Sequence, residues 1–177
     1  CKNQNWDILG IEPNEKAKAT AIGKGITFGE TIEQLESNSF DVITMWHVLE
    51  HVPDVEHQVA ELKRLLKPSG TIIIAVPNFK SYDAMYYKSN WAAYDVPRHI
   101  YHFNPETIQF VANKHGFKLV KQRGQIFDSF YIALLSNQYR TGSKRLIHSF
   151  LLGLWSNVLA WTKTGNYSSN VYIFKHV

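Results

Sequence analysis

The stretch Thr71-Ile-Ile-Ile-Ala-Val76, followed by Pro77 and Asn78, is a continuous run of β-branched and small residues. Strands that are apolar throughout, without alternating polar residues, are expected where both faces of a parallel sheet are covered. Pro77 has no backbone N–H group and therefore ends the run. The stretch predicts a central strand of an α/β protein.

The residues before this strand predict a repeating pattern of strands and helices. Residues 55–66 carry apolar side chains at helical spacing, and Lys67-Pro-Ser-Gly70 supplies a cation and turn residues that end this helix. Phe40-Asp-Val-Ile-Thr-Met45 and Trp6-Asp-Ile-Leu-Gly-Ile-Glu12 are two further short apolar runs, the second of which stops at Pro13. This order predicts a doubly wound, Rossmann-like sheet.

Helix caps, apolar spacing and alternation assign the remaining segments. Further helices are predicted over residues 15–21, 31–36, 105–115, 127–139 and 145–162. Further strands are predicted over residues 25–28, 117–122 and 170–175. Residues 79–102 show no steady period, and we expect a long loop there with at most one helical turn. Loops of this length are usually functional.

The composition indicates one globular domain over residues 1–177, with a helical insertion at about 127–165. Of the 177 residues 45% are hydrophobic, and the net charge of +4 comes from 19 Lys and Arg against 15 Asp and Glu. These charges form no basic tract, so we expect an anionic ligand rather than nucleic acid. The single cysteine, Cys1, excludes an internal disulfide and is typical of the cytoplasm. The sequence has no apolar run of 18 residues, so we expect no transmembrane segment.

Polar residues follow three predicted strands at the edge where open α/β sheets bind ligands. They are Glu12, the cluster from His47 to His51, and Asn78. An acid at the end of the second strand of a nucleotide-binding unit commonly binds ribose hydroxyls. Glu12 is a candidate for that role, or alternatively it caps the helix that begins after Asn14.

Four motifs in register over residues 6–122 resemble the class I S-adenosylmethionine-dependent methyltransferases, especially their ubiquinone-pathway branch. The motifs are Gly10-Ile-Glu-Pro13, residues 40–54, Leu65-Leu-Lys-Pro-Ser-Gly70 leading into Ile74-Ala-Val-Pro-Asn78, and Val96-Pro-Arg-His-Ile-Tyr-His-Phe103 before Gly116-Phe117. The resemblance implies a Rossmann-like fold, S-adenosyl-L-methionine as the cofactor, and transfer of its methyl group to oxygen or nitrogen of a small-molecule or lipid-like acceptor.

The resemblance also implies a first strand and a glycine-rich loop roughly 20 residues before Glu12, which this sequence does not contain. We therefore expect an N-terminally truncated domain that binds the cofactor poorly by itself. Loss of a central strand would expose two long strand edges, so a homodimer or a strand swap is expected.

The resemblance suggests a role for each polar residue near the strand ends. The expected roles are cofactor binding by Glu12, Trp46 and His47, proton transfer by His51 and His99, and acceptor binding by Asn78, Trp91 and Arg98. Neutral imidazole can accept a proton near the working pH, which favours histidine as the base. For each histidine and aromatic residue a purely structural role is the alternative.

A metal site is the main alternative use of the histidine cluster. His47-x-x-Glu50-His51 matches an inverted zinc-peptidase motif, but a strand precedes it and Pro53 follows, which leaves about one helical turn. Relatives carry a glutamate where this chain has His47 and bind a divalent ion, and imidazole there would favour Zn²⁺, Mn²⁺ or Fe²⁺ over Mg²⁺. We expect no metal, with Glu50, His51 and His99 as candidates if one binds.

Two other classes of function stay open: an inactive, methyltransferase-like interaction module and a metal-dependent hydrolase. The two late helices, over residues 127–139 and 145–162, are expected to pack with a buried face. A lid, a dimer face and a membrane contact beside Lys144 and Arg145 are the alternatives.

Overall fold

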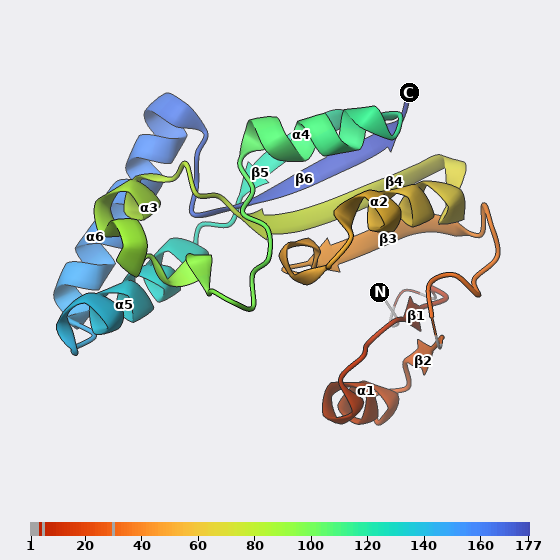
Figure 1. The fold of residues 1–177 in the computed structure, drawn as a ribbon, viewed down its shortest axis with the longest axis horizontal. Helices are drawn as coiled ribbons and strands as arrows, with labels where there is room; N and C mark the ends of the chain where they lie inside the picture. The colour runs from red at the N-terminus through yellow and green to blue at the C-terminus, as the bar shows by residue number, and fades with distance from the viewer. Residues whose placement is uncertain (1–3, 5, 30) are drawn as a thin grey trace.

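The strands of the computed structural model, which describes residue 4, residues 6–29 and residues 31–177, form two sheets (Figure 1). The smaller sheet pairs β1 (Leu9–Gly10) in parallel with β2 (Thr27–Phe28), and α1 (Glu15–Ile22) connects the two strands. The larger sheet has four strands in the order β3-β4-β6-β5. Cys1, on which the disulfide prediction rests, lies outside the described residues.

The four-stranded sheet is mixed. β3 (Phe40–Trp46) and β4 (Leu66–Pro77) are parallel, and α2 (Val55–Leu65) connects them. β6 (Ser169–His176) is antiparallel to both β4 and β5 (Phe117–Gly124), so the last strand of the sequence lies between two earlier ones. The predicted α/β class and Rossmann-like arrangement are confirmed.

One face of this sheet, covered by α2 and by α4 (Pro105–Lys114), holds the main core. Ile72 and Ile74 on β4 are 1% and 3% exposed, whereas Ile73 between them is half-buried. The run in β4 was expected to be covered on both faces. This holds at its carboxyl end, where Ala75 and Val76 are both fully buried, but Thr71 and Ile73 nearer its start are only half-buried. The difference follows from the position of α2 and α4 on the same side, where they contact each other.

A second group of helices lies beyond the carboxyl ends of β3 and β4 (Figure 1). It comprises α3 (Tyr82–Tyr87), α5 (Asp128–Thr141) and α6 (Leu146–Leu159), and a π-helical turn, Ala160–Thr164, extends α6. Buried Asp83 on α3 accepts hydrogen bonds from Trp91 Nε1 at 2.7 Å and from Ser156 Oγ on α6 at 2.8 Å. None of the helices formed by the described residues combines the length and apolar character needed to cross a bilayer.

Three local predictions are wrong. Residues 31–36 form turns rather than a helix, because the guanidinium of Arg64 donates to Leu35 O at 2.7 Å and Ile32 O at 3.1 Å and so uses carbonyls that a helix would need. Residues 67–70 belong to β4 as an irregularity, since Leu66 pairs with Phe40 and Thr71 already pairs with Val42. Residues 79–102 contain α3 and two 3-10 turns, because their aromatic side chains pack against α5.

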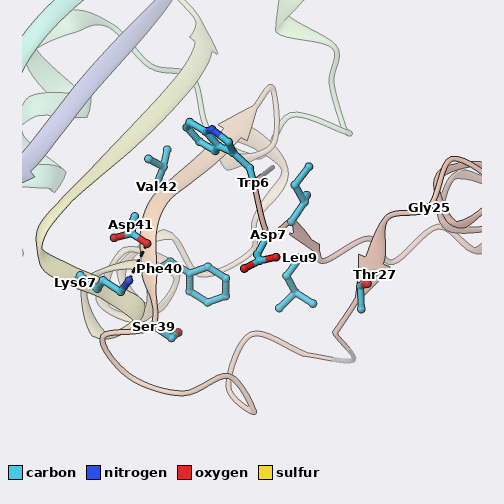
Figure 2. Close-up of a pocket in the computed structure, with 11 residues that line it drawn as sticks. Trp6, Asp7, Leu9, Gly25, Thr27, Ser39, Phe40, Asp41, Val42 and Lys67 are labelled. Carbon is cyan, nitrogen blue, oxygen red and sulfur yellow. Dashed lines mark hydrogen bonds and ion pairs between the residues drawn. The ribbon is translucent and has the colours of Figure 1, made fainter. Parts of the chain in front are cut away.

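A cleft of about 840 Å³ separates the two sheets (Figure 2). Residues of β1 and the segment before it form one wall, and Phe40, Asp41 and Val42 of β3 form the other. β1 pairs only with β2 and β3 pairs only with β4 within the described chain, so one edge of each strand is unpaired. None of the described residues before Met45 is fully buried.

Candidate functional site

The site begins where β3 ends in a sharp turn. Trp46, the last residue of β3, is 52% exposed, and His47 after it has a φ of +53°. A positive φ is uncommon for a residue other than glycine, so contacts must hold His47 in place. Its backbone N–H donates to Ala75 O at 3.0 Å. A single 3-10 turn, Leu49–His51, follows, and the backbone of Val52 is extended.

This turn does not provide the helix that a zinc-peptidase motif needs. Such a motif places both histidines on one face of an α-helix. His47 instead precedes the 3-10 turn, and His51 is its last residue. The hydrolase interpretation therefore lacks its structural basis.

His47 is held as a cation between two carboxylates. Its Nδ1 lies 3.3 Å from Glu50 Oε1, and its Nε2 lies 3.3 Å from Asp128 Oδ2 and 3.0 Å from Gln125 Oε1. Hydrogen bonding to Asp128 and then to Glu50 raises the pKa of His47 to about 10, although burial opposes the shift. An imidazolium has protons on both nitrogens, so His47 in this state has no lone pair to offer a metal.

Glu50 is the buried centre of the site. It is 1% exposed, and its Oε2 has no hydrogen-bond partner among the described residues. Its backbone oxygen accepts from Ile100 N at 2.8 Å and Tyr101 N at 3.2 Å, which fixes the segment that carries His99. A buried carboxylate oxygen without a donor is costly, so the atom is a candidate for binding a cation.

His51 and His99 form a pair with ring centroids 4.6 Å apart. His51 Nδ1 lies 2.9 Å from Arg98 O, and His99 Nδ1 lies 2.8 Å from Ala93 O. Because a carbonyl oxygen can only accept, both Nδ1 atoms donate and each Nε2 keeps its lone pair when the ring is neutral. Burial lowers the pKa of His99, which favours the neutral ring.

The three candidate ligands for a metal lie together. One ligand atom from each of Glu50, His51 and His99 lies within 4.8 Å of the other two. Two neutral imidazoles and a carboxylate are a donor set suited to Zn²⁺, Mn²⁺ or Fe²⁺, and backbone carbonyls hold both rings in the tautomer that leaves Nε2 for the ion. Ligand atoms around Zn²⁺ are roughly 3.3 Å apart, so the side chains would have to close slightly around an ion.

Glu12 lies at the carboxyl end of β1, where the sequence placed it. Its Oε1 accepts from the backbone N–H of Asn14 at 2.9 Å. Asn14 Oδ1 in turn accepts from Lys16 N and Ala17 N and so caps α1. One carboxylate oxygen of Glu12 therefore supports the start of α1, as the helix-capping alternative expected. Binding of a ligand by Glu12 stays a prediction.

The three residues expected to contact an acceptor do not lie together at the surface. Asn78 is fully buried and donates to Asn166 Oδ1 at 3.1 Å and to Tyr167 O at 3.2 Å. Trp91 is 2% exposed and belongs to the core with α5. Arg98 is exposed and forms an ion pair with Asp95 at 2.7 Å. Only Arg98 of the three has a side chain that an acceptor could reach.

Sequence reasoning missed Gln125 and Asp128, which hold His47 from the beginning of α5. The sequence carried a weak signal, because Asp128 occupies the first turn of a predicted helix. Nothing in the sequence indicated that this turn would lie against the end of β3.

Comparison with known proteins gives a consistent result. A family model described as a methyltransferase domain matches residues 1–122. The ubiquinone biosynthesis O-methyltransferase of Haemophilus ducreyi is 38% identical over 80 residues, covering 40% of this chain and 34% of that protein. The protein of the same name from Citrobacter koseri is 34% identical over 76 residues, covering 40% and 31%. The chain thus spans about a third of the length of these curated relatives.

Solved structures share the fold. A SAM dependent methyltransferase from Archaeoglobus fulgidus has a TM-score of 0.63 and 18% identity, covering 99% of this chain and 78% of the other. Phosphoethanolamine N-methyltransferase 2 from Haemonchus contortus, in complex with S-adenosyl-L-methionine, has a TM-score of 0.57 and 20% identity, covering 96% and 43%. At these identities the likeness concerns the fold alone.

Proposed function

This chain belongs to the methyltransferase-domain family, and on that premise we propose that it acts as part of an S-adenosylmethionine-dependent methyltransferase. The observation that carries the proposal is the histidine pair, His51 and His99, whose Nδ1 atoms donate to backbone carbonyls and so leave both Nε2 atoms to face a ligand beyond the carboxyl end of β3. This pair lies within the residues that the family model matches. The acceptor atom is oxygen or nitrogen.

The cofactor would lie along the carboxyl ends of β1 and β3. We assign the ribose hydroxyls to Glu12, whose second carboxylate oxygen remains for a ligand beside the bond to Asn14. Trp46, half exposed at the end of β3, supplies an apolar surface next to it. His47 shapes the wall beside the methionine end through its bonds to Glu50 and Asp128. The bound cofactor supplies an electrophilic methyl group on a sulfonium.

The protein residues would orient the acceptor and remove its proton. Methyl transfer requires the acceptor atom to lie in line with the breaking bond between sulfur and the methyl carbon. His99 is neutral near the working pH because burial lowers its pKa, so its Nε2 can take the proton from an acceptor hydroxyl or ammonium group. His51 lies against the His99 ring and is the second candidate base.

A divalent ion is a second candidate for the same site, favoured by Glu50 Oε2, which has no hydrogen-bond partner in the part of the chain that the structure describes. Glu50, His51 and His99 would bind it through the carboxylate and the two Nε2 atoms. A bound ion lowers the pKa of a hydroxyl that it contacts and orients it, which serves the same methyl transfer. Binding of Zn²⁺ by calorimetry, abolished in Glu50→Gln, is the result expected of a metal-dependent enzyme.

The cleft between β1 and β3 supports the expectation that the active protein has a further strand there. Both unpaired edges face this cleft, and parallel neighbours lie about 4.8 Å apart, so one strand can bridge two such edges. A segment upstream of Cys1 is the proposed occupant, and a second copy of the chain is the alternative through a strand swap. Without an occupant we expect weak cofactor binding.

The acceptor class and the cellular location are proposed from the relatives and from the composition. We propose a small-molecule or lipid-like acceptor, since the curated relatives are ubiquinone biosynthesis O-methyltransferases. The absence of a basic tract argues against nucleic acid. The lone cysteine, Cys1, supports a cytoplasmic location.

Calorimetry with S-adenosylhomocysteine tests the cofactor assignment, in this chain and in a form extended upstream of Cys1. Glu12→Gln is expected to weaken binding by about 1–3 kcal/mol, because bound ribose hydroxyls lose a charged partner. Glu15→Gln, on the exposed first turn of α1, is the matched control and should bind as the unchanged protein does. Equal affinity of the two variants would contradict the role of Glu12, and no binding by either form would contradict the proposed function.

A further inference from the structure

Helix α6 has its polarity reversed relative to a helix on the surface of a water-soluble domain. The residues that α6 buries are mostly small or polar: Ser149, Leu152, Gly153, Ser156 and Asn157. The residues that it exposes are large and apolar: Leu146, Ile147, Phe150, Leu151, Leu154 and Trp155, each between 43% and 78% exposed. The expectation that this helix would pack with its apolar face buried is wrong.

Contacts with α5 fix this orientation. Asn137 Nδ2 donates to Ser149 Oγ at 2.7 Å, and Asn157 Nδ2 donates to Ser129 Oγ at 2.8 Å. A Cβ added at Gly153 would lie 2.9 Å from Phe130 Cδ1, so the two helices approach closely there. Turning the apolar face inward would break these bonds and force large side chains into the space that Gly153 leaves. Small residues and side-chain hydrogen bonds between helices, with apolar residues outside, are typical of helix pairs that face lipid.

The exposed apolar face lies in a part of the chain that carries only positive charge. Residues 129–177 contain five Lys and Arg and no Asp or Glu. Arg140, Lys144 and Arg145 lie near the turn between α5 and α6, and Lys163 lies in the π-helical turn at the other end of α6. Cations at both ends of an apolar helix face suit the headgroups of anionic lipids, while the apolar side chains enter the acyl boundary.

We propose that the exposed face of α6 binds an anionic membrane surface, with the helix lying in the plane of the interface. A second copy of the chain fits less well, because an isologous dimer would bring this face and its cations against themselves with no acidic residue from 129–177 between them. α5 and α6 lie beyond the carboxyl ends of β3 and β4, on the side of the candidate site (Figure 1). The contact would therefore place that site beside the bilayer.

Co-sedimentation with lipid vesicles tests the proposal without any assay of methyl transfer. The chain is expected to sediment with phosphatidylcholine vesicles that contain phosphatidylglycerol and to stay in solution with phosphatidylcholine alone, and high salt should weaken the binding. The double variant Phe150→Glu, Trp155→Glu should lower the vesicle affinity by about tenfold or more. Phe110→Glu, at a 69% exposed apolar residue on α4, is the matched control and should bind normally.

A second measurement covers the case in which the double variant does not fold. Lipids brominated in their acyl chains should quench tryptophan fluorescence of the unchanged chain, and Trp155→Phe with Trp161→Phe should remove most of that quenching while vesicle binding persists. No sedimentation with anionic vesicles, equal loss in Phe110→Glu, or quenching that survives both Phe substitutions would overturn the proposal. A dimer in light scattering that the double variant dissociates would overturn it in favour of a second copy.

Discussion

This chain contains two strand-helix-strand units in which the two strands pair in parallel. Only the second unit contributes to a hydrophobic core. In the first, β1 and β2 pair over two residues each, and α1 buries no residue. In the second, β3 pairs with β4 over most of its length, and α2 buries Val55, Val59, Leu62 and Leu65. The two helices also differ in sequence, because the apolar residues of α1 are mainly alanines, whereas α2 carries a stripe of Val and Leu.

The neighbours of the two units differ as well. β4 has a partner on each edge, and α4 packs beside α2 over the same face. Among the described residues β1 has a partner on one edge only, and its other side borders the cleft. Because burial of apolar surface contributes about 25 cal/mol per Å², a unit without a second neighbour gains little stability. A parallel unit is therefore stabilised by the strand beside it as well as by its own sequence pattern.

Hydrogen exchange should show the largest contrast between the two units. Amides of β4 are expected to exchange only through global unfolding, which costs about 5–15 kcal/mol in a typical domain, while amides of β1 and β2 open at a cost near zero. Exchange followed by mass spectrometry gives the opening free energy of each segment. Equal protection of β1 and β4 would contradict this contrast. It would show that contacts across the space of the cleft stabilise the first unit.

Matched leucine substitutions should show the next largest effect. Leu62→Ala removes a side chain that is 2% exposed and should lower the free energy of unfolding by about 2–5 kcal/mol. Leu9→Ala in half-buried β1 should cost less than about 1 kcal/mol. Urea denaturation measures both. A cost of Leu9→Ala equal to that of Leu62→Ala would contradict the contrast.

The ion pair of His47 ties the second unit to α5 and should give a smaller, pH-dependent effect. The pKa of folded His47, about 10, lies above its ordinary value of 6.5, so its contribution is complete below pH 6.5 and is lost as the pH rises toward 10. Because the side chain is 36% exposed, we expect His47→Gln to cost only about 1–2 kcal/mol at low pH.

Urea denaturation at both ends of this pH range measures the His47 effect. The difference in unfolding free energy between the unchanged protein and His47→Gln should shrink toward high pH. His57→Gln, which removes an exposed pair with Glu33, is the control and should change stability little at either pH. A difference that stays constant with pH would show that His47 is not charged in the folded protein.

Helix caps should give the smallest contrast. Asn104 caps α4 with a reciprocal pair of hydrogen bonds to Thr107, and Asn104→Ala should cost about 1 kcal/mol in urea denaturation. Asn14 caps α1 through its side chain, which accepts from Lys16 N and Ala17 N, but Asn14→Ala should leave global stability within about 0.5 kcal/mol, because α1 contributes little to it. The reverse order of the two costs would mean that α1 belongs to the cooperative unit.

The parts of the fold that were predicted are those with a local signal. The apolar runs of β3 and β4 and the spacing of α2 depend on nearby residues, and the sequence located all three. Arg64 could not be placed from sequence, since it reaches Leu35 across 29 positions and so replaces a predicted helix with turns. The order of the sheet was equally hidden, because β6 pairs with strands far from it in sequence.

The residues of the candidate site also fall into those that the sequence indicated and those that depend on distant contacts. The strand-end rule pointed to Glu50 and His51, which follow β3 closely, and family resemblance added Trp46 and His99. The contact of His47 with Asp128 joins distant segments, so the charge of His47 could not be inferred from the sequence. Burial separated Asn78 and Trp91 from the accessible candidates, and an aromatic or amide residue in a loop gives no indication of its burial.

The position of β6 also determines when the sheet can form during synthesis. β6 separates β4 from β5, so these two strands have no mutual partner until residues 169–176 have left the ribosome. Until then β4 offers an open edge and β5 has no neighbour in the sheet, while α5 and α6 have already been made. An open edge of this kind can pair with other chains, so the risk of aggregation is greatest before β6 has been made.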